Sequence, residues 1–435
     1  MNRPGQPLLA KLNFSKAATD TAGYRNIPLA AKTILKMLGH LSAGHLAIGL
    51  PNGEIQYFGN PADTLHAEIH VLDWGLFRDV LRHGDIGFAE SYIRGKWETP
   101  NLKLLLELAI RNRTILEKAI YGSWAGSLAY RLKHWLRRNS KAGSRKNIHA
   151  HYDLGNDFYS LWLDETMSYS SGFFESSDQA SLAQAQNAKY QHILNSLECK
   201  AGDSVLEIGC GWGGFMEVAT RAGLSITGLT LSNEQAKFAL ERIAQLTQAT
   251  TLNGNQTSQR PISHSVRLQD YRDCHDQFDG IASIEMFEAV GESHWPEYFQ
   301  SIAACLKPNG KACVQTIVIA VELFERYRNS TDFIQQYVFP GGMLPSRDAF
   351  IIQANLAGLQ IDSELSFGKD YAKTLELWFE QFNAKLPEVR QLGFDEAFIR
   401  LWNFYLMYCA AGFSEQNIDV VQFTLSHRPT KKYMQ

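Results

Sequence analysis

Two rhythms of hydrophobic and polar residues follow one another along this chain and divide it into two parts. In the first part, residues 27–41 have a helical period, and three short runs with alternating hydrophobic and polar residues follow, at 45–50, 54–58 and 65–71. Turn-forming residues separate the runs, and helical patterns then cover 72–82, 88–94 and 102–116. The pattern predicts a small α+β domain over residues 1–120.

From residue 151 onward, short apolar runs alternate with amphipathic stretches. We expect strands at 205–208, 225–230, 265–268, 280–284 and 311–319, and helices at 215–222, 233–246, 295–306 and 350–357. The tail at 373–423 is aromatic-rich and mainly helical before a last strand at 420–425. Such alternation predicts βαβ units, so residues 151–435 are expected to form an α/β domain with a mainly parallel, Rossmann-like sheet and helices on both faces.

Composition narrows the class of protein. A chain of 435 residues with 45% hydrophobic and 20% charged residues is typical of a globular protein with two domains. The net charge of −3 gives no general attraction to nucleic acid, which is not expected as a partner. The six cysteines form no C-x-x-C pair, which favours reduced thiols and a cytoplasmic location. No signal-peptide pattern and no run of ~18 apolar residues is present, so any membrane contact is expected to be peripheral.

A basic segment joins the two predicted domains. Residues 118–152 contain no acidic residue, and aromatic residues such as Trp124 and Trp135 are interleaved with eight lysines and arginines. We expect a linker helix at 121–150. Its composition suits the anionic surface of a bilayer, but it suits a solvated interdomain helix equally well, and RNA binding is a third, weaker alternative.

The most informative motif is Gly-Cys-Gly-Trp-Gly-Gly at 209–214, directly after the predicted strand at 205–208. Glycine lets the backbone turn sharply and approach a ligand, and parallel sheets bind ligands at the carboxyl ends of their strands. The spacing fits a dinucleotide fingerprint only in part. Glu207 would repel phosphate but suits a ligand with an ammonium group and hydroxyls, such as S-adenosylmethionine. The alternative is a tight turn that binds no ligand.

Several further motifs, in the same order along the chain, carry a resemblance to a known family. They are HYDLGNDFY at 151–159, Tyr169-Ser170, the glycine loop, GLTLS at 228–232 with Gln235, QDYRD at 269–273, EMFE at 285–288, FPGGMLPS at 339–346 and the stretch 370–378. Over residues 40–425 the chain resembles the cyclopropane-fatty-acyl-phospholipid synthases and the related mycolic-acid methyltransferases. The resemblance implies a class I S-adenosylmethionine-dependent methyltransferase that acts on lipid double bonds.

The resemblance also implies roles around S-adenosylmethionine. Tyr169 and Ser170 would hold its methionine end, and Glu207 would order the glycine loop. The other implied cofactor-binding residues are Gly209 and Gly211 beside the amino-acid portion, Thr230 and Gln235 at the ribose, Leu231, and Asp270 and Tyr271 beside the adenine. For Thr230 and Gln235 the alternative is a plain strand end and helix N-cap.

Methylation of an alkene leaves a carbocation, so the site needs a dry apolar channel, negative potential and one base. Loss of a proton from the delivered methyl group closes a cyclopropane ring, whereas loss from a neighbouring chain carbon gives a methyl- or methylene-branched chain. For the acyl channel we expect Leu323, Phe324, Phe333, Tyr337, Phe339 and Met343, although this spacing is equally typical of an ordinary core.

In the cyclopropane synthases that this chain resembles, the base is a bicarbonate held by a cysteine, a glutamate, a histidine, an isoleucine backbone and a tyrosine. Glu288, Ile317 and Tyr371 match three of these positions, but Ser171 replaces the cysteine and Gln315 replaces the histidine. Serine and glutamine still donate hydrogen bonds, so bicarbonate binding stays open as one alternative.

Glu285 offers another candidate for the base, because it is an additional carboxylate where the bicarbonate type tends to have glycine. If this stretch is helical, Glu285 and Glu288 share one face, and repulsion between them should raise one pKa toward neutrality, as suits a general base. The competing interpretation is that Glu285 pairs with an arginine or caps a helix. No metal is expected, and Cys409 is expected in the core rather than as a nucleophile.

These inferences predict a peripheral membrane enzyme at the inner face of the membrane. It would transfer a methyl or methylene carbon from S-adenosylmethionine to the cis double bond of unsaturated acyl chains in phospholipids, with the N-terminal domain helping to present the lipid. The alternatives are a methyltransferase for a small amine or natural product, and a non-catalytic lipid-binding protein. The sequence leaves the oligomeric state open, with a homodimer as one alternative.

Overall fold

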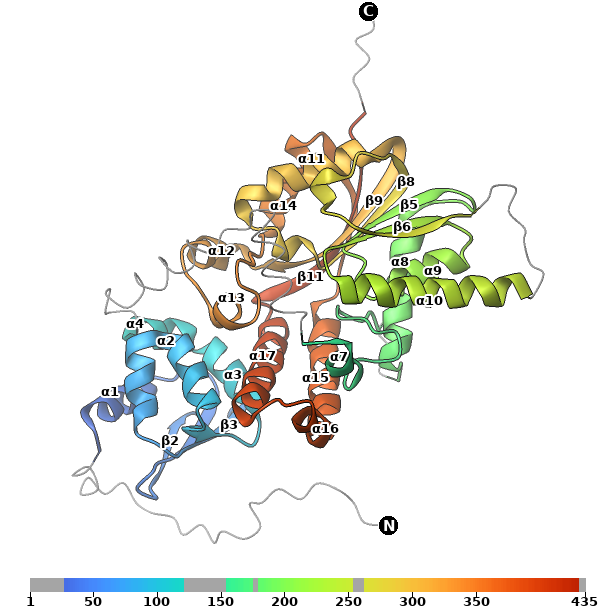
Figure 1. The fold of residues 1–435 in the computed structure, drawn as a ribbon. Coiled ribbons are helices and arrows are strands. Elements are labelled where there is room, and N and C mark those ends of the chain that lie inside the picture. The colour runs from blue at the N-terminus through green and yellow to red at the C-terminus, as the bar shows by residue number, and fades with distance from the viewer. Residues whose placement is uncertain (1–26, 121–153, 175–178, 253–261, 430–435) are drawn as a thin grey trace, which may run out of the picture.

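The computed structural model describes residues 27–120, 154–174, 179–252 and 262–429 (Figure 1). The predicted basic linker at 121–150 lies outside these ranges, so its helical form and its contacts stay predictions.

A four-stranded sheet with order β2-β1-β3-β4 forms the N-terminal part. Its strands are β1 (His45–Gly49), β2 (Ile55–Gly59), β3 (His66–Val71) and β4 (Trp97–Glu98). β1 and β3 are parallel, and the other two pairs are antiparallel. The three predicted runs are therefore confirmed as a small sheet.

Four helices accompany this sheet: α1 (Leu29–Leu38), α2 (Gly75–Ile93), α3 (Leu102–Arg111) and α4 (Arg113–Ile120). The sequence predicted two helices at 72–82 and 88–94, but the structure joins them into α2 with a kink at Gly84, where φ is 59° and ψ is −131°. Glycine is needed there because this backbone conformation is strained for residues with a Cβ.

The second sheet has the order β10-β11-β9-β8-β5-β6-β7. Its strands are β5 (Ser204–Ile208), β6 (Ser225–Thr230), β7 (His264–Leu268), β8 (Phe278–Ile284), β9 (Leu306–Ile319), β10 (Leu359–Ser366) and β11 (Ile418–His427). β5 to β9 are parallel to one another, and β11 runs antiparallel to both of its neighbours, β9 and β10. The strand order reverses beside β5, and parallel sheets bind ligands at such a switch point.

Helices cover both faces of this sheet, as the sequence predicted. Val205 and Ile226 pack with α8 (Leu182–Leu197), α9 (Gly214–Arg221) and α10 (Asn233–Leu252) on one face. Leu206 and Ile281 pack with α11 (Trp295–Cys305) and α14 (Arg347–Leu356) on the other. Successive residues of β5 thus point to opposite cores, which is the period of a strand buried on both sides.

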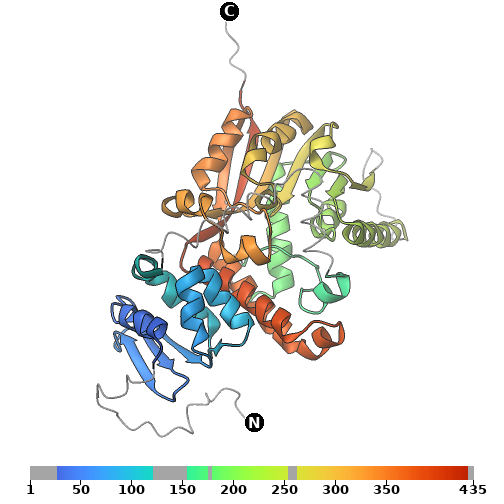
Figure 2. The ribbon, with the colours of Figure 1, turned by 60° about the vertical axis from the view of Figure 1, so that its left-hand side comes forward.

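The C-terminal helices connect the two sheets. They are α15 (Gly368–Ala384), α16 (Leu386–Gln391) and α17 (Glu396–Ser414), and the helices α7 (Asn156–Ser160), α12 (Val321–Arg328) and α13 (Phe333–Tyr337) lie near them. In both views α17, in red, lies beside the blue N-terminal helices (Figures 1 and 2), and it contacts α2 and α3. One hydrophobic cluster runs from α1 through α3 into α15 and α17. The domain boundary near residue 120 stays a prediction.

The predicted helical tail and final strand are confirmed by α15, α17 and β11. The sequence interpretation missed α8, α12, α13 and β10. No helix within the described ranges combines the length and apolarity that crossing a bilayer requires.

Candidate active site

Two cavities meet at Glu285. The first, which we call the strand-end cavity, has a volume of about 160 Å³ and lies at the carboxyl ends of β5, β6, β7 and β8. The second, the apolar cavity, has a volume of about 520 Å³ and extends from this point into the N-terminal part. Tyr169, Glu285 and Ala289 line both cavities, so these residues mark the junction.

The structure brings all nine predicted cofactor-binding residues to the strand-end cavity: Tyr169, Ser170, Gly209, Gly211, Thr230, Leu231, Gln235, Asp270 and Tyr271. They come from four separate segments, which the parallel sheet gathers at one edge. This convergence supports a bound ligand over the alternative of an empty tight turn.

The glycine loop follows β5 and leads into α9. Gly209, Gly211 and Gly213 have φ values of 81°, 51° and 80°, which glycine adopts readily and other residues rarely do. A Cβ on Gly211 would meet no atom within 4 Å, so this turn of the backbone faces open space. The loop can therefore approach a ligand closely.

Thr230 and Gln235 are tied to one another, because the Thr230 hydroxyl donates to the Gln235 amide oxygen at 3.0 Å. Both side chains are buried. α10 instead takes its N-terminal hydrogen bond from Ser232, whose Oγ accepts from the Gln235 backbone N–H at 3.3 Å. The N-cap of α10 is therefore Ser232, and neither Thr230 nor Gln235 has that role.

Asp270 holds Arg272 in a buried pair with two parallel hydrogen bonds, 2.8 Å from Nε and 2.7 Å from Nη2. This pair fixes the loop after β7 beside the predicted adenine position. Tyr271 lies against Tyr298, with ring centroids 5.5 Å apart.

Lys189 was missed by the sequence interpretation and lies fully buried behind Ser170. Its ammonium group donates to the Ser170 hydroxyl at 2.6 Å and to the Gln186 amide oxygen. Burial lowers the pKa of Lys189 to about 7, against the opposing effect of Glu285 and other carboxylates. Lys189 lies on the buried face of α8 with Ala185 and Ile193. A lysine that follows the helical spacing of apolar residues was the one signal in the sequence for a buried, functional side chain.

Glu207 does not order the glycine loop by hydrogen bonding, contrary to expectation. Among the described residues its Oε2 is buried without a hydrogen-bond partner, and its side chain lines the strand-end cavity. Burial raises the pKa of this carboxyl well above its usual value. An orphaned carboxylate oxygen beside an open glycine turn fits a ligand with a donor such as an ammonium group or hydroxyl, as S-adenosylmethionine has.

The apolar cavity is lined mainly by hydrophobic side chains from α1, α2, α3 and α17 and from the two sheets. Of the predicted channel residues, Leu323, Phe339 and Met343 line it. The other three predictions are wrong. Phe324 stacks on Trp295 outside it, Phe333 is buried against Phe404, and the Tyr337 hydroxyl donates to Glu90.

Glu285 follows the last residue of β8 and has a φ of 50°, so the condition that this residue is helical is not met. Left-handed conformations of non-glycine residues cost on the order of 1 kcal/mol or more and persist where the surroundings fix them. The Glu285 backbone N–H donates to the Gln315 carbonyl at 2.8 Å. This conformation directs the carboxylate to the junction of the cavities.

Three donors hold the Glu285 carboxylate. Its Oε1 accepts from the Ser171 backbone N–H at 2.9 Å and from the Gln315 amide at 2.7 Å, and its Oε2 accepts from the Tyr371 hydroxyl at 2.5 Å. Burial raises the pKa of Glu285, although these hydrogen bonds and Lys189 oppose that shift. Neither an arginine pair nor a helix cap accounts for Glu285.

The positions that the resemblance assigned to bicarbonate are thus occupied by a side chain. Ser171, Gln315 and Tyr371 all bind Glu285, and the Ile317 backbone N–H donates to Glu288 at 2.5 Å. Ser171 takes part through its backbone N–H only, because its hydroxyl donates to the Gly172 carbonyl. With all of these donors engaged by the protein's own carboxylates, the arrangement does not fit bicarbonate.

Glu288 lies in the short 3₁₀ helix η4 (Phe287–Ala289) and lines the apolar cavity. Its Oε2 is buried and has no hydrogen-bond partner among the described residues. Burial, and then the charge of Glu285, raises the pKa of Glu288 to about 8. At neutral pH Glu288 is therefore mainly protonated, which limits its repulsion of the Glu285 carboxylate.

A second layer behind Glu285 consists of amide groups. The side-chain amide oxygen of Gln315 accepts a hydrogen bond from the amide nitrogen of Gln422 at 2.9 Å. The amide oxygen of Gln422 in turn lies 2.5 Å from Nδ1 of His192. Cys409 lines the apolar cavity, and burial raises the pKa of its thiol, which disfavours the thiolate of a nucleophile.

Comparisons with known proteins identify the family of this chain. Residues 139–423 match the family described as mycolic acid cyclopropane synthetase. The chain is 37% identical over 377 residues to tuberculostearic acid methyltransferase UfaA1 of Mycobacterium tuberculosis, covering 82% of each chain. It is 34% identical over 361 residues to the cyclopropane-fatty-acyl-phospholipid synthase of Escherichia coli K12, covering 83% of this chain and 88% of the relative.

Solved structures give the same result. The cyclopropane synthase MmaA2 from Mycobacterium tuberculosis has a TM-score of 0.57 and 30% identity, covering 65% of this chain and 97% of that one. The mycolic acid cyclopropane synthase CmaA1 complexed with SAH and CTAB has a TM-score of 0.57 and 32% identity, with the same coverage. The chain therefore belongs to the mycolic acid cyclopropane synthetase family and is an S-adenosylmethionine-dependent methyltransferase with the class I fold.

Proposed function

We propose that this enzyme transfers a one-carbon unit from S-adenosylmethionine to the cis double bond of unsaturated acyl chains in membrane phospholipids, with Glu285 as the base and a branched, unsaturated chain as the product. The observation that carries the proposal is the position of Glu285, which lines both cavities. The relatives named for tuberculostearic acid and for acyl-phospholipids support the substrate class.

The strand-end cavity provides the cofactor site in this proposal. Tyr169 and Ser170 would hold the methionine end, Gly209 and Gly211 would let the backbone approach it, Thr230, Leu231 and Gln235 would surround the ribose, and Asp270 and Tyr271 would flank the adenine. Glu207 would accept from the ammonium group or a hydroxyl through its unpartnered oxygen. S-adenosylmethionine supplies an electrophilic methyl group on a positively charged sulfur.

The apolar cavity provides the acyl site. The alkene electron pair forms the new carbon–carbon bond as the carbon–sulfur bond breaks, and a carbocation remains on the chain. The lining of this cavity is mainly apolar, and the Glu285 carboxylate would be the base at the junction. It would accept a proton from a neighbouring chain carbon, whose bonding electrons then form a new double bond.

The residues around Glu285 serve this step by positioning. Tyr371, Ser171 and Gln315 fix both carboxylate oxygens. Ile317 orients Glu288, which is largely protonated at neutral pH and therefore adds little repulsion to Glu285. A tethered base of fixed orientation favours one proton of the chain, and we infer a branched product over a ring.

The location of the enzyme belongs to the same proposal. The basic segment at 121–150 would contact the anionic inner face of the membrane, where the unsaturated chains are found. A peripheral, cytoplasmic enzyme would draw the chain into the apolar cavity from that surface.

Two measurements test the function. Titration calorimetry with S-adenosylmethionine tests the cofactor site, and mass analysis of lipids from cells that express the protein tests the transfer. We expect phospholipid acyl chains heavier by one CH₂ group, with the chromatographic retention of a branched standard. Retention of a cyclopropane standard would assign the ring product instead, and cofactor binding without any mass change would favour a non-catalytic lipid-binding protein.

A further inference from the structure

Lys189 of α8 is a fully buried cation behind the strand-end cavity. Its ammonium group donates to the Ser170 hydroxyl at 2.6 Å and to the amide oxygen of Gln186 at 2.5 Å, and both of these acceptors are neutral. Burial lowers its pKa, and the carboxylates that oppose this shift, Glu285 first, accept no hydrogen bond from it. A buried ammonium group with neutral partners costs free energy, so this lysine calls for a function.

Gln186 and Lys189 fix Ser170 at two of its atoms. The Gln186 amide nitrogen donates to the Ser170 backbone carbonyl at 2.8 Å, while Lys189 donates to Oγ. Ser170 is 5% exposed and lines the strand-end cavity, whereas Gln186 and Lys189 do not line it. The two residues of α8 therefore act on this cavity only through the serine in front of them.

Lys189 decides which way the Ser170 hydroxyl can act. A charged ammonium group has only protons to give, so Oγ accepts from it and the hydroxyl proton points elsewhere. No described residue accepts that proton. The hydroxyl is therefore a free donor at the wall of the strand-end cavity, and the positive charge behind it strengthens its bond to an anionic acceptor.

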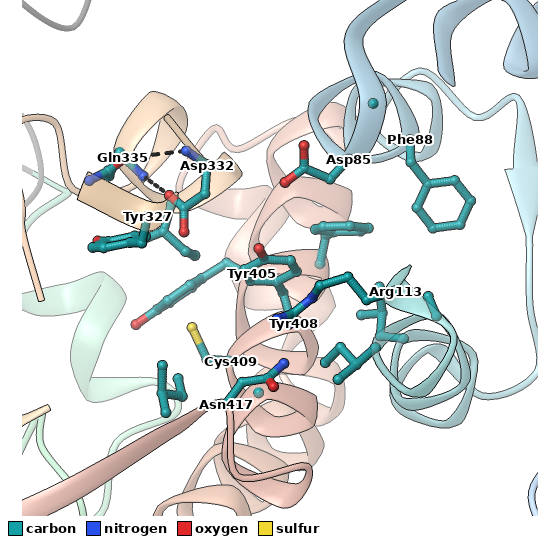
Figure 3. A pocket seen from close by; sticks show the side chains of 18 of the residues that line it. Asp85, Phe88, Arg113, Tyr327, Asp332, Gln335, Tyr405, Tyr408, Cys409 and Asn417 are labelled. Carbon is teal, nitrogen blue, oxygen red and sulfur yellow. Dashed lines mark hydrogen bonds between the residues drawn. The ribbon is translucent and has the colours of Figure 1, made fainter. Parts of the chain in front are cut away.

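Two other cations of the described residues are placed elsewhere. Arg272 lines the strand-end cavity, but Asp270 already holds it by two hydrogen bonds beside the predicted adenine position. Arg113 lines the apolar cavity only, where Figure 3 shows it extending toward Tyr408 of α17. Lys189 is thus the cation behind the predicted methionine end of the cofactor.

Glu207 brings the opposite charge to the same cavity. Its Oε2 is buried, has no hydrogen-bond partner among the described residues, and belongs to a side chain that lines the strand-end cavity. An amino acid carries an ammonium group and a carboxylate on one carbon. A buried acceptor at Glu207 and a free donor at Ser170 match these two groups.

We propose that Lys189 is a positioning residue for the carboxylate of S-adenosylmethionine and acts through the Ser170 hydroxyl. It turns the hydroxyl proton into the strand-end cavity and supplies the positive charge that a buried carboxylate requires. The inference rests on the proposed function for the placement of the methionine end at Ser170.

Calorimetry with two ligands isolates this role without measuring turnover. S-adenosylmethionine is compared with decarboxylated S-adenosylmethionine, which keeps the adenosine, the sulfonium and the ammonium group but lacks the carboxylate. We expect K189M to bind S-adenosylmethionine about tenfold or more weakly than the wild type. Binding of the decarboxylated ligand should stay nearly unchanged, whereas a merely structural lysine would affect both ligands alike.

Matched variants show whether Lys189 acts through Ser170. S170A should show the same selective loss, and K189M added to S170A should weaken binding little further, since the hydroxyl is already absent. K200M removes an exposed lysine that follows α8 and should bind both ligands like the wild type. K189Q is neutral and still polar, and it gives the same comparison if K189M fails to fold.

The outcomes separate this inference from the proposed function. Equal losses for both ligands in the Lys189 variants, or an unchanged affinity for S-adenosylmethionine, would overturn the inference. A full further loss in S170A/K189M would also overturn it, because Lys189 would then act independently of the hydroxyl. A selective loss in a protein that methylates no lipid would leave the carboxylate site standing and remove the proposed function.

Discussion

The hydroxyl of Tyr371 donates a hydrogen bond of 2.5 Å to Oε2 of Glu285, and this contact joins α15 to the end of β8 at the junction of the two cavities. Burial raises the pKa of Tyr371 well above its ordinary value, so the phenol stays a donor throughout the physiological pH range. The carboxylate is thereby held in one orientation, which a base requires if it is to remove one particular proton.

Replacing Glu285 by glutamine tests the assignment of the base. The amide fills nearly the same space but accepts no proton, so we expect the turnover number to fall by about 10²–10⁴-fold. The affinity for S-adenosylmethionine, measured by calorimetry, should change little. E325Q, which alters an exposed glutamate of α12, is the matched control. Unchanged turnover of E285Q would remove Glu285 from the mechanism.

The Y371F variant tests how the pKa of the base is set. The Tyr371 hydrogen bond lowers the pKa of Glu285 against the larger effect of burial, so its loss should raise that pKa further. The base must be ionised to act, and the acid limb of the turnover profile should therefore move to higher pH. We expect a larger rate loss at pH 6 than at pH 9. An equal loss at both pH values would mean that Tyr371 does not act through the ionisation of Glu285.

The strands and the glycine loop could be predicted because their signals are local. The period-two runs of the first sheet and the apolar strand before Gly209 are set by residues next to one another in sequence. β10 has mostly polar, partly exposed positions, since it lies at the edge of its sheet, and it carries no comparable pattern. α8 was missed because Gln186 and Lys189 occupy its buried face.

The candidate site was predicted as a set of residues but not as an arrangement. The sequence identified Glu285 as an extra carboxylate, yet its left-handed backbone depends on donors from β9 and α15 that lie far away in sequence. Ser171 contacts Glu285 through its backbone N–H. Almost every residue type has this group, so the identity of residue 171 could not indicate the contact. Lys189 supports Ser170 from behind and was visible only as a lysine among buried positions.

Glu288 should make the folded protein less stable as the pH rises. The pKa of Glu288 is about 8 in the folded protein, against an ordinary value of 4.5 for a glutamate in the unfolded chain. Between these two pH values the folded state therefore holds a proton that the unfolded state has released. The associated stability is fully present below pH 4.5 and is lost as the pH rises through 8. Glutamine resembles the protonated acid and does not titrate.

We therefore expect E288Q to gain stability relative to the wild type between pH 5 and pH 9, by on the order of a few kcal/mol. Urea unfolding at both pH values measures this difference. E292Q, at a half-buried carboxylate near the surface that pairs with Arg328, is the control and should show little pH dependence. A difference between E288Q and wild type that is the same at pH 5 and pH 9 would contradict the raised pKa.

His192 of α8 is expected to orient the base through two amide side chains. The Gln422 amide nitrogen donates to Gln315, so its oxygen faces His192, and Nδ1 of His192 must carry the proton of that contact. This donor fixes the direction of both amides, and only in that direction does Gln315 present N–H to Glu285.

In H192F the two amides lose this constraint and can rotate together, which would turn the Gln315 oxygen toward the Glu285 carboxylate. Repulsion would then raise the pKa of Glu285, so we expect a severalfold loss of turnover that is largest at low pH, with an unchanged KM for the lipid. H192N keeps a side-chain N–H donor and should restore part of the rate. Equal activity and equal pH profiles of H192F and wild type would show that the amide pair holds its orientation without His192.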